Sequence, residues 1–207
     1  MKPYRQNLVK VFNKTVDWDS DALKWTLHTS TYTPNFDTHA FQSDLTNELG
    51  TAGGYTASGL AIAVPTMVAT AANSWAVVRA NSTAYALGDV FRPAATNGFL
   101  YCVVTAGTSA AAPPVFPTVV GTTVADGTAV IECVGAGIVV LGCSDPTWPA
   151  ATFGPCRYAV LADTTPGTAA TNPLIGLVDF VTDKTGGGGN FVVNLHASLR
   201  AMHFFIP

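Results

Sequence analysis

Hydrophobic and polar residues alternate most regularly near the start of the chain, over residues 22–28. Leu23, Trp25 and Leu27 point to one side of an extended segment, and the residues between them, Lys24, Thr26 and His28, point to the other. A period of two residues is typical of a strand with one buried face. The pattern therefore predicts a half-buried β-strand here.

The period changes after the turn signal at Pro34-Asn35. Phe41, Leu45 and Leu49 are spaced four residues apart, Asp37 precedes them in an N-cap position, and Gly50 follows them. Apolar residues at this spacing form one stripe along a helix, and glycine commonly ends one. We expect a single short α-helix over about residues 37–49, stabilised mainly by packing.

The rest of the chain is rich in Val, Ile, Phe and Tyr in short runs that are separated by Gly, Pro, Asn or Thr. Such runs predict strands, and they cover residues 60–68, 76–79, 89–92, 98–104, 128–134, 137–143, 156–162, 174–181, 190–196 and 201–206. The predicted fold class is therefore mainly β: a β-sandwich scaffold with one short helix.

The pattern is interrupted in the middle of the chain. The segment 75–136 has its own series of aromatic and turn residues, including Tyr85, Gly88-Asp89 and Asp126-Gly127. We predict that residues 1–74 and 137–207 form one discontinuous β-sandwich scaffold, and that residues 75–136 form a small β module inserted into it. A module carried on a surface loop favours display over catalysis.

Composition narrows the functional classes. Charged residues make up 11% of the chain, less than half of the roughly 25% in an average soluble domain. A surface with few charges suits extensive contact with other proteins, since few charges lose water on binding. The net charge of −3 does not predict nucleic-acid binding. Without a long apolar run we expect no membrane span, and without an apolar segment after Arg5 we expect no signal peptide and synthesis in the cytoplasm.

Four cysteines are present: Cys102 and Cys133 in the predicted module, and Cys143 and Cys156 in the scaffold. For a chain without a signal peptide, buried free thiols are the expected state. Each pair falls on strands that can be neighbours, so a disulfide within either pair stays an alternative. The cysteine spacing lacks the short C-x-x-C of a zinc site.

Motifs with catalytic or metal-binding chemistry are incomplete. Asp17, Asp19 and Asp21 resemble the start of a calcium loop, but Ala22 and His28 stand where glycine and glutamate are needed. The segment Asp183-Lys-Thr-Gly186 matches only part of a phosphorylation signature and is interpreted as a turn. Asp89 and Asp126 lie in turn-like positions, where carboxylates cap backbone amides. We therefore expect no enzyme, no catalytic residues, no metal and no cofactor.

The aromatic residues of the inserted module are its strongest functional signal. Exposed flat rings stack on sugars or on partner proteins. Trp75 and Tyr85 flank turns and are the rings that we expect to be exposed, and Tyr101 lies nearby in sequence. These three residues are the candidate glycan-binding set. The alternative is that the rings form the module's own core, as a small domain requires.

Parts of the scaffold resemble virion proteins of tailed phages. The resemblance is carried by residues 27–48, which include Thr31-Tyr-Thr-Pro34-Asn35, and continues over residues 53–57, 155–160 and 172–180. It implies a capsid-associated or other structural role for the chain and no reaction.

The inserted module is similar to small chitin-binding β modules of carbohydrate-binding families 5 and 12, which recur in phage structural proteins. The matching residues are Trp75, Tyr85, Gly88-Asp89-Val90, Gly98, Tyr101, Pro113 and Asp126-Gly127-Thr128. The second exposed tryptophan of such modules has no counterpart in this chain.

Together these observations predict a phage virion structural protein. We expect a capsid decoration or cement protein that docks on the head shell and displays the module outward. Its expected partners are the major capsid protein and copies of itself, with a trimer favoured because cement proteins often sit on three-fold axes. A host-surface glycan is a further expected partner; nucleic acid and membrane are not. A tail or baseplate component and a host-glycan adhesion protein are the alternatives.

Overall fold

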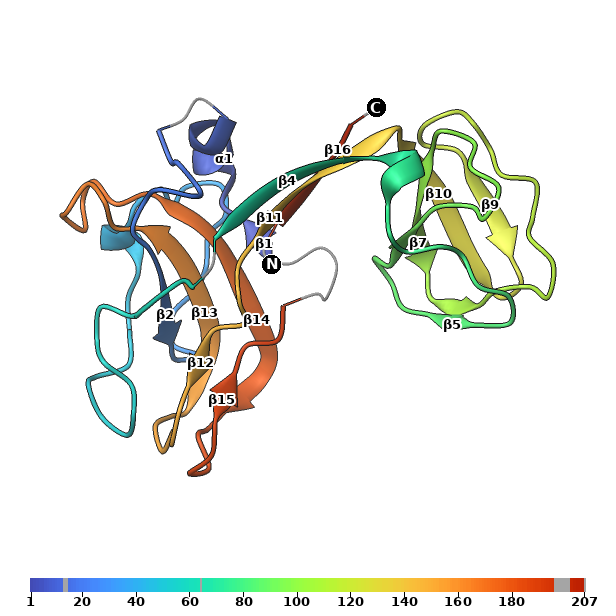
Figure 1. The fold of residues 1–207 in the computed structure, drawn as a ribbon. Helices are drawn as coiled ribbons and strands as arrows, with labels where there is room; N and C mark the ends of the chain where they lie inside the picture. Colours follow the sequence, from blue (N-terminus) through green and yellow to red (C-terminus); the bar gives the residue numbers. More distant parts are fainter. Residues whose placement is uncertain (13–14, 64, 196–201, 207) are drawn as a thin grey trace. The chain divides into compact units, whose positions relative to one another are not determined.

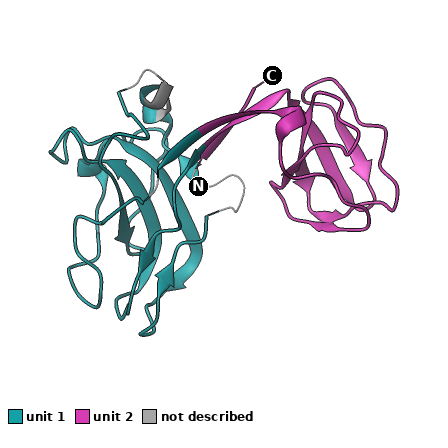
Figure 2. Ribbon diagram, in the orientation of Figure 1, with its two compact units in different colours: residues 1–67, 141–201 teal, residues 68–140, 202–207 magenta. Residues whose placement is uncertain are grey.

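The structure is a computed structural model, and it describes residues 1–12, 15–63, 65–195 and 202–206 (Figure 1). The chain is mainly β, with several antiparallel sheets, which confirms the predicted fold class. Its internal contacts divide it into two compact units (Figure 2). Unit 1 comprises residues 1–67 and 141–201, and unit 2 comprises residues 68–140 and 202–207.

The unit boundaries differ somewhat from the predicted domain boundaries at 74/75 and 136/137. The chain passes from unit 1 to unit 2 within β4 (Thr66–Ala71) and returns within β11 (Gly137–Gly142). These strands belong to a three-stranded sheet of order β16-β11-β4, in which β16 (Met202–Ile206) is the last strand of the chain. The C-terminal strand therefore groups with unit 2, although the sequence pattern placed it in the scaffold.

Unit 1 is built around a five-stranded sheet in which neighbouring strands are antiparallel. In spatial order its strands are β1 (Lys2–Pro3), β14 (Leu174–Lys184), β13 (Cys156–Asp163), β2 (Leu23–His28) and β3 (Leu60–Ala61). A separate pair joins β12 (Thr147–Trp148) to β15 (Phe191–Val192). Long-range pairing of this kind brings sequence-distant loops to the same edge of the sheet.

The strand β2 confirms the strongest sequence prediction, but it is buried on both faces. Leu23, Trp25 and Leu27 are buried as expected, and Thr26 and His28 on the opposite face are each only 1% exposed. This second face is covered by the connection that follows β2, which contributes Tyr32 to a core with Tyr4 and Val160. The prediction of a half-buried strand is therefore wrong for the polar face.

The predicted helix over residues 37–49 is also wrong. Only Gln42–Asp44 is helical there, as the short 3-10 helix η1. The amides of Ala40 and Phe41 donate to the carboxylate of Asp44, at 2.7 and 2.9 Å. The amides of Gln42 and Ser43 donate to carbonyls of the 164–172 connection, at 2.8 and 2.9 Å. Side chains and another loop thus take the hydrogen bonds that a helix would need.

The one α-helix among the described residues is α1 (Arg5–Phe12), which the sequence pattern did not predict. It is anchored at its start, where the buried Tyr4 donates its backbone amide to Ile175 and its side chain contacts the hydroxyl of Tyr32 at 2.8 Å. Near its end, the ammonium of Lys10 lies 4.2 Å from the centre of the Phe41 ring. No helix in the described part of the chain is long and apolar enough to cross a membrane.

Unit 2 contains a four-stranded sheet and a two-stranded one. The first has the order β6 (Val90–Phe91), β7 (Leu100–Thr105), β10 (Ala129–Gly135) and β9 (Thr123–Asp126), and the second pairs β5 (Ala84–Tyr85) with β8 (Gly107–Thr108). The core of the larger sheet is formed by Phe91, Tyr101, Val103, Ile131 and Cys133. Before this sheet lies the 3-10 helix η2 (Ala72–Ser74).

Most predicted strands overlap an observed one. An exception is residues 76–79, which make only a single bridge, from Val78 to Arg92. Predictions for residues 196 and 201 lie outside the described residues.

Candidate functional site

The rings predicted to bind glycan lie largely within unit 2. Trp75 is 8% exposed and donates its indole N–H to the carbonyl of Val90 at 3.0 Å. Tyr101 is fully buried, and its hydroxyl donates to the carbonyl of Pro117 at 2.7 Å. The prediction that Trp75 is exposed is therefore wrong, because the ring is buried and its indole N–H is bonded to β6.

Tyr85 is half-buried. Its ring packs against Phe91 with centroids 5.0 Å apart, and its hydroxyl accepts a hydrogen bond from the amide of Ala80 at 2.7 Å. The structure thus places Trp75, Tyr85 and Tyr101 in or against the core of unit 2, each with its polar atom already bonded. Their arrangement fits the alternative interpretation, in which a small module uses its aromatic residues as its own core.

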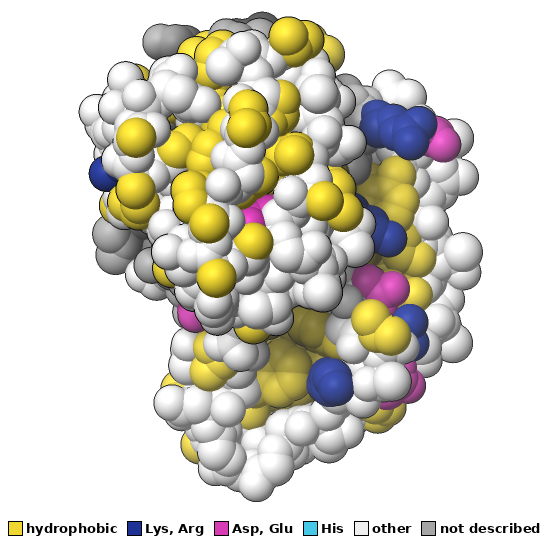
Figure 3. All heavy atoms as spheres, turned by 90° about the vertical axis from the view of Figure 1, so that its right-hand side faces the viewer, with side chains coloured by type: hydrophobic (Ala, Val, Ile, Leu, Met, Phe, Trp, Pro, Cys, Tyr) yellow, Lys and Arg dark blue, Asp and Glu magenta, His cyan; other side chains and the backbone are white. Residues whose placement is uncertain are grey.

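Beside this core, unit 2 exposes an uncharged connection between β8 and β9. Within it Val115 is 92% exposed, Val119 68% and Val120 46%. Together with Ala111, Ala112, Pro113 and Pro114 these residues form what we call the apolar loop, residues 111–120. The face of unit 2 that is turned toward the viewer in Figure 3 carries many hydrophobic side chains and few charged ones.

The base of the apolar loop is fixed by a buried ion pair. Arg79 donates from Nε and Nη2 to the two carboxylate oxygens of Asp126, and from Nη2 to the carbonyl of Ala110 at 2.8 Å. Arg79 also contributes to a cavity of about 320 Å³. This cavity is lined by Arg79, Asn81, Pro93, Ala94, Ala95, Pro113, Pro114 and Phe116. Asp126 also accepts from the amide of Ala110, which agrees with the predicted capping role.

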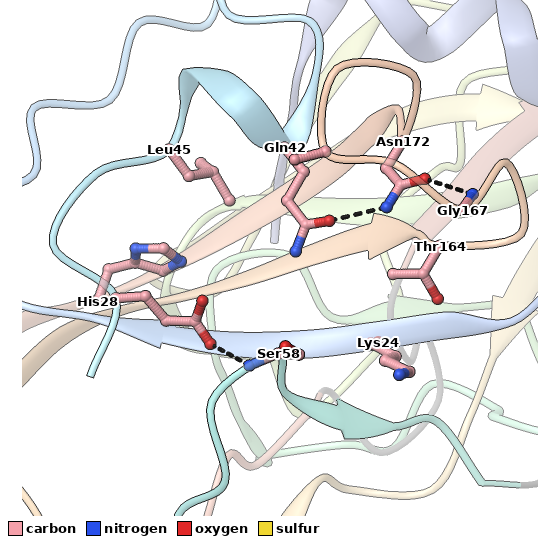
Figure 4. Close-up of a pocket in the computed structure, with 10 residues that line it drawn as sticks. Lys24, His28, Gln42, Leu45, Ser58, Thr164, Gly167 and Asn172 are labelled. Atoms are coloured by element: carbon pink, nitrogen blue, oxygen red, sulfur yellow. Dashed lines mark hydrogen bonds between the residues drawn. The ribbon is translucent and has the colours of Figure 1, made fainter. Parts of the chain in front are cut away.

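Unit 1 holds a different kind of cavity, which we call the polar pocket (Figure 4). Its volume is about 460 Å³, and it is lined by Lys24, His28, Gln42, Leu45, Glu48, Ser58, Thr164, Gly167, Ala169 and Asn172. These residues come from β2, from η1 and the segment after it, from the turn before β3, and from the connection between β13 and β14. The segment that was predicted to be a helix thus forms one wall of the pocket, with Gln42, Leu45 and Glu48.

A pair of amides holds that wall to the opposite connection. Asn172 is only 4% exposed, and its Nδ2 donates to Oε1 of Gln42 at 2.8 Å. Its Oδ1 accepts from the amide of Gly167 at 3.0 Å. Because Oε1 of Gln42 is fixed as an acceptor, the Nε2 group is directed away from Asn172, as Figure 4 shows.

A carboxylate is fixed on the other side of the polar pocket. Oε1 of Glu48 accepts from the hydroxyl of Tyr55 at 2.6 Å and from the amide of Ser58 at 2.8 Å. Ser58 has a φ of 78°, a left-handed conformation that is uncommon outside glycine. The carboxylate therefore holds the turn that brings Ser58 to the pocket.

His28 contributes to this architecture as a neutral group. Its Nδ1 lies 2.8 Å from the carbonyl of Thr46, which accepts only if Nδ1 carries the proton, and its Nε2 lies 2.9 Å from the hydroxyl of Thr26. Burial lowers the pKa of His28, outweighing the opposing effects of the Thr46 carbonyl and the Glu48 charge. Both ring nitrogens of this histidine are therefore bonded to its neighbours.

The remaining sequence candidates do not form a site. Within the described ranges, no three His, Cys, Asp or Glu side chains come together in a way that could hold a metal ion. Asp21 accepts from the amide of Asp17 at 2.6 Å, as in a tight turn. Asp183 accepts from the hydroxyl of Ser30 at 3.2 Å. All four cysteines are free, and Cys133, Cys143 and Cys156 are buried as expected, whereas Cys102 is half-buried.

Sequence reasoning did not find the polar pocket. Its residues are separated by up to 148 positions along the chain, from Lys24 to Asn172, and no motif links them. The only local signal was the alternation in β2, which placed Lys24 and His28 on one face. Comparison of the chain with protein families, with curated proteins and with solved structures finds no match. The chain's own residues are therefore the basis for assigning its function.

Proposed function

We propose that this chain is a structural protein of a phage virion, a decoration or cement protein that docks on the head shell. The observation that carries the proposal is the apolar loop of unit 2, in which Val115 and Val119 are 92% and 68% exposed. Exposed apolar residues gathered in one segment mark a surface that another protein covers. We propose that this surface contacts a neighbouring subunit of the particle.

Composition supports the same proposal. Only 11% of the residues are charged, so a large area can be covered without removing many charges from water. The start of the apolar loop is also held in place, because Arg79, paired with Asp126, donates to the carbonyl of Ala110 just before the loop. A preorganised loop loses little conformational entropy when it docks. Subunits that bind only the assembled shell stabilise it by mass action.

The proposal is tested by a cryo-EM reconstruction of the virion and by rebinding the purified chain to heads from which it has been removed. Replacing Val115 and Val119 together by Ser should weaken rebinding at least tenfold, because each buried valine contributes about 1.5 kcal/mol or more. Val9→Ser, at an exposed position of α1 in unit 1, is the matched control and should rebind normally. A virion map without the chain would refute the proposal.

The reconstruction also tests the partners. Density on the shell at three-fold axes would support contact with the major capsid protein and a trimer of this chain. Density in the tail or baseplate would favour the alternative structural role. The aromatic residues give little support to an adhesion role for unit 2, since Trp75 and Tyr101 are at most 8% exposed.

A further inference from the structure

The polar pocket of unit 1 contains hydrogen-bonding groups that the protein itself leaves unused. Among the described residues, Nζ of Lys24, Nε2 of Gln42 and Oγ of Ser58 have no hydrogen-bond or ion-pair partner. The second oxygen of Glu48 is equally unpaired, since both of its protein donors bind Oε1. Lys24, Gln42 and Glu48 are half-buried, and Ser58 is exposed at the edge of the pocket. The unpaired groups of these residues face the pocket and are not bonded to one another.

These groups are held in position. Gln42 is fixed by the buried Asn172, and Glu48 is fixed by Tyr55 and by the amide of Ser58. In Figure 4 the amide nitrogen of Gln42 points into the space between η1 and β2, toward the side from which Lys24 and Ser58 approach. A set of polar groups whose supporting bonds are already made binds a ligand with little reordering.

The chemistry of the set selects among ligands. A phosphate or other strong anion would meet Lys24 but also the carboxylate of Glu48, which opposes it. A metal ion would meet Glu48 but also the ammonium of Lys24. Hydroxyl groups suit both residues, because a hydroxyl donates to a carboxylate oxygen and accepts from an ammonium or amide N–H. Leu45 adds an apolar contact, which suits the C–H surface of a sugar ring.

We propose that the polar pocket of unit 1 binds one sugar unit of a glycan, through neighbouring hydroxyls that contact Glu48, Gln42 and Lys24. The volume of about 460 Å³ lies within the range of small-molecule sites and admits one sugar ring with room for its linkage. This inference is independent of the proposed structural role, and it places glycan binding in unit 1, away from Trp75, Tyr85 and Tyr101.

The experiment uses the full chain labelled with ¹⁵N. Glucose, galactose, N-acetylglucosamine and galacturonic acid are titrated separately to about 50 mM. Glycine is titrated as the control for an amino-acid ligand, because its carboxylate could bind Lys24 and its ammonium could bind Glu48. Expected is a saturable shift of the amide signals of Ser58, Gly167 and Asn172 with at least one of the sugars. Amide signals of unit 2, such as those of Val115 and Tyr85, should stay unchanged.

Variants that preserve shape then test the assigned groups. Gln42→Glu keeps the acceptor for Asn172 but removes the N–H donor, Glu48→Gln keeps Oε1 but replaces the free oxygen by a donor, and Lys24→Met removes the charge. Each should weaken sugar binding at least tenfold, because the hydrogen bonds that are lost involve charged or preorganised groups. Lys184→Met, at the exposed end of β14, is the control and should bind as the natural chain does.

Two results would overturn the proposal. One is the absence of shifts at the pocket with every sugar of the panel, or shifts with glycine alone, which would indicate an amino-acid ligand. The other is sugar binding of equal strength in the three pocket variants, which would place the site elsewhere. The titration of the natural chain tests sugar binding even if a variant fails to fold.

Discussion

Arg79 and Asp126 form a bidentate ion pair that is almost completely removed from solvent. Two N–H···O distances of 2.6 Å join them, and their side chains are 3% and 0% exposed. Nη1 of Arg79 donates to Asn81, and Nη2 also donates to the carbonyls of Ala110 and Ala112. Burial tends to raise the pKa of Asp126, but the hydrogen bonds from Arg79 and Ala110 outweigh it, so this pKa is lowered.

Replacing Asp126 by Ala should destabilise unit 2 by about 3–5 kcal/mol, because it leaves the Arg79 charge buried without a partner. Unit 2 contains one tryptophan, Trp75, while the other three lie in unit 1. Fluorine NMR of 5-fluorotryptophan-labelled protein in increasing urea therefore follows each unit separately. Only the Trp75 signal should shift its unfolding midpoint.

The exposed pair of Arg5 and Asp37 provides the control for this experiment. Its side chains are 77% and 68% exposed, so Asp37→Ala should cost less than about 1 kcal/mol. Equal urea midpoints for the Trp75 signal in the natural chain and in Asp126→Ala would show that the buried pair does not stabilise unit 2. Because the pKa of Asp126 is lowered in the folded state, the ion pair stabilises unit 2 at neutral pH, and this stabilisation is lost as the pH falls through that pKa.

Asp163 presents the opposite case. Its side chain is buried at the end of β13, Oδ1 accepts from the amide of Thr165 at 2.8 Å, and Oδ2 has no hydrogen-bond partner. Burial raises the pKa of Asp163, and the neighbouring carboxyl of Asp21 raises it further, against the bonds from Thr165. The folded state therefore retains a proton that the unfolded chain loses at lower pH, and stability falls as the pH rises through this window.

Asp163→Asn should consequently stabilise unit 1 at pH 7, by about 1–2 kcal/mol, because the amide stays neutral and its N–H group can donate to Asp21. Urea unfolding at pH 4 and pH 7 measures the effect through the tryptophans of unit 1. The gain should shrink at the lower pH. If Asp163→Asn is less stable than the natural chain at pH 7, the buried carboxyl of Asp163 does not destabilise unit 1.

Much of the strand content could be predicted from the sequence, because strands such as β2 and β13 have runs of residues that fit a pleated, buried surface. The helix at 37–49 could not be excluded in this way. The apolar residues in this segment do have helical spacing. However, the carboxylate of Asp44 accepts hydrogen bonds from the amides of Ala40 and Phe41, and the carbonyl of Asn172 accepts one from the amide of Gln42. Competition from a side chain and from a distant loop leaves no trace in local periodicity.

The sites show the same limit. An aromatic residue beside a turn, such as Trp75, looks the same in sequence whether its ring is exposed or closes a core. The polar pocket depends on β2 and the 164–172 connection lying side by side, which follows from the pairing of β13 with β2. Pairing partners are set by the whole fold, so Lys24 and Asn172 carry no shared signal.

His28 should remain neutral to a lower pH than an ordinary histidine. Burial is the main cause of its lowered pKa, and the carbonyl of Thr46 fixes the neutral tautomer. Because the unfolded chain binds this proton more readily, the stability of unit 1 should fall as the pH drops below about 6.5. A pH titration of the His28 ring signals by NMR checks this, and a midpoint at or above the ordinary value would refute it.

The cysteines should react slowly in the folded protein. Burial is the main cause that raises the pKa of Cys102 and of Cys156 to about 11, and Cys133 and Cys143 are at most 5% exposed. Since the thiolate is the reactive form, Cys102 at pH 8 should react with DTNB roughly a hundredfold more slowly than a free thiol. In denaturant all four thiols should react rapidly. Cys102 is the informative residue, because it is only half-buried and steric protection alone would leave it reactive. Fast reaction of one thiol in the native state, or fewer than four reactive thiols after denaturation, would contradict the free and protected state of these cysteines.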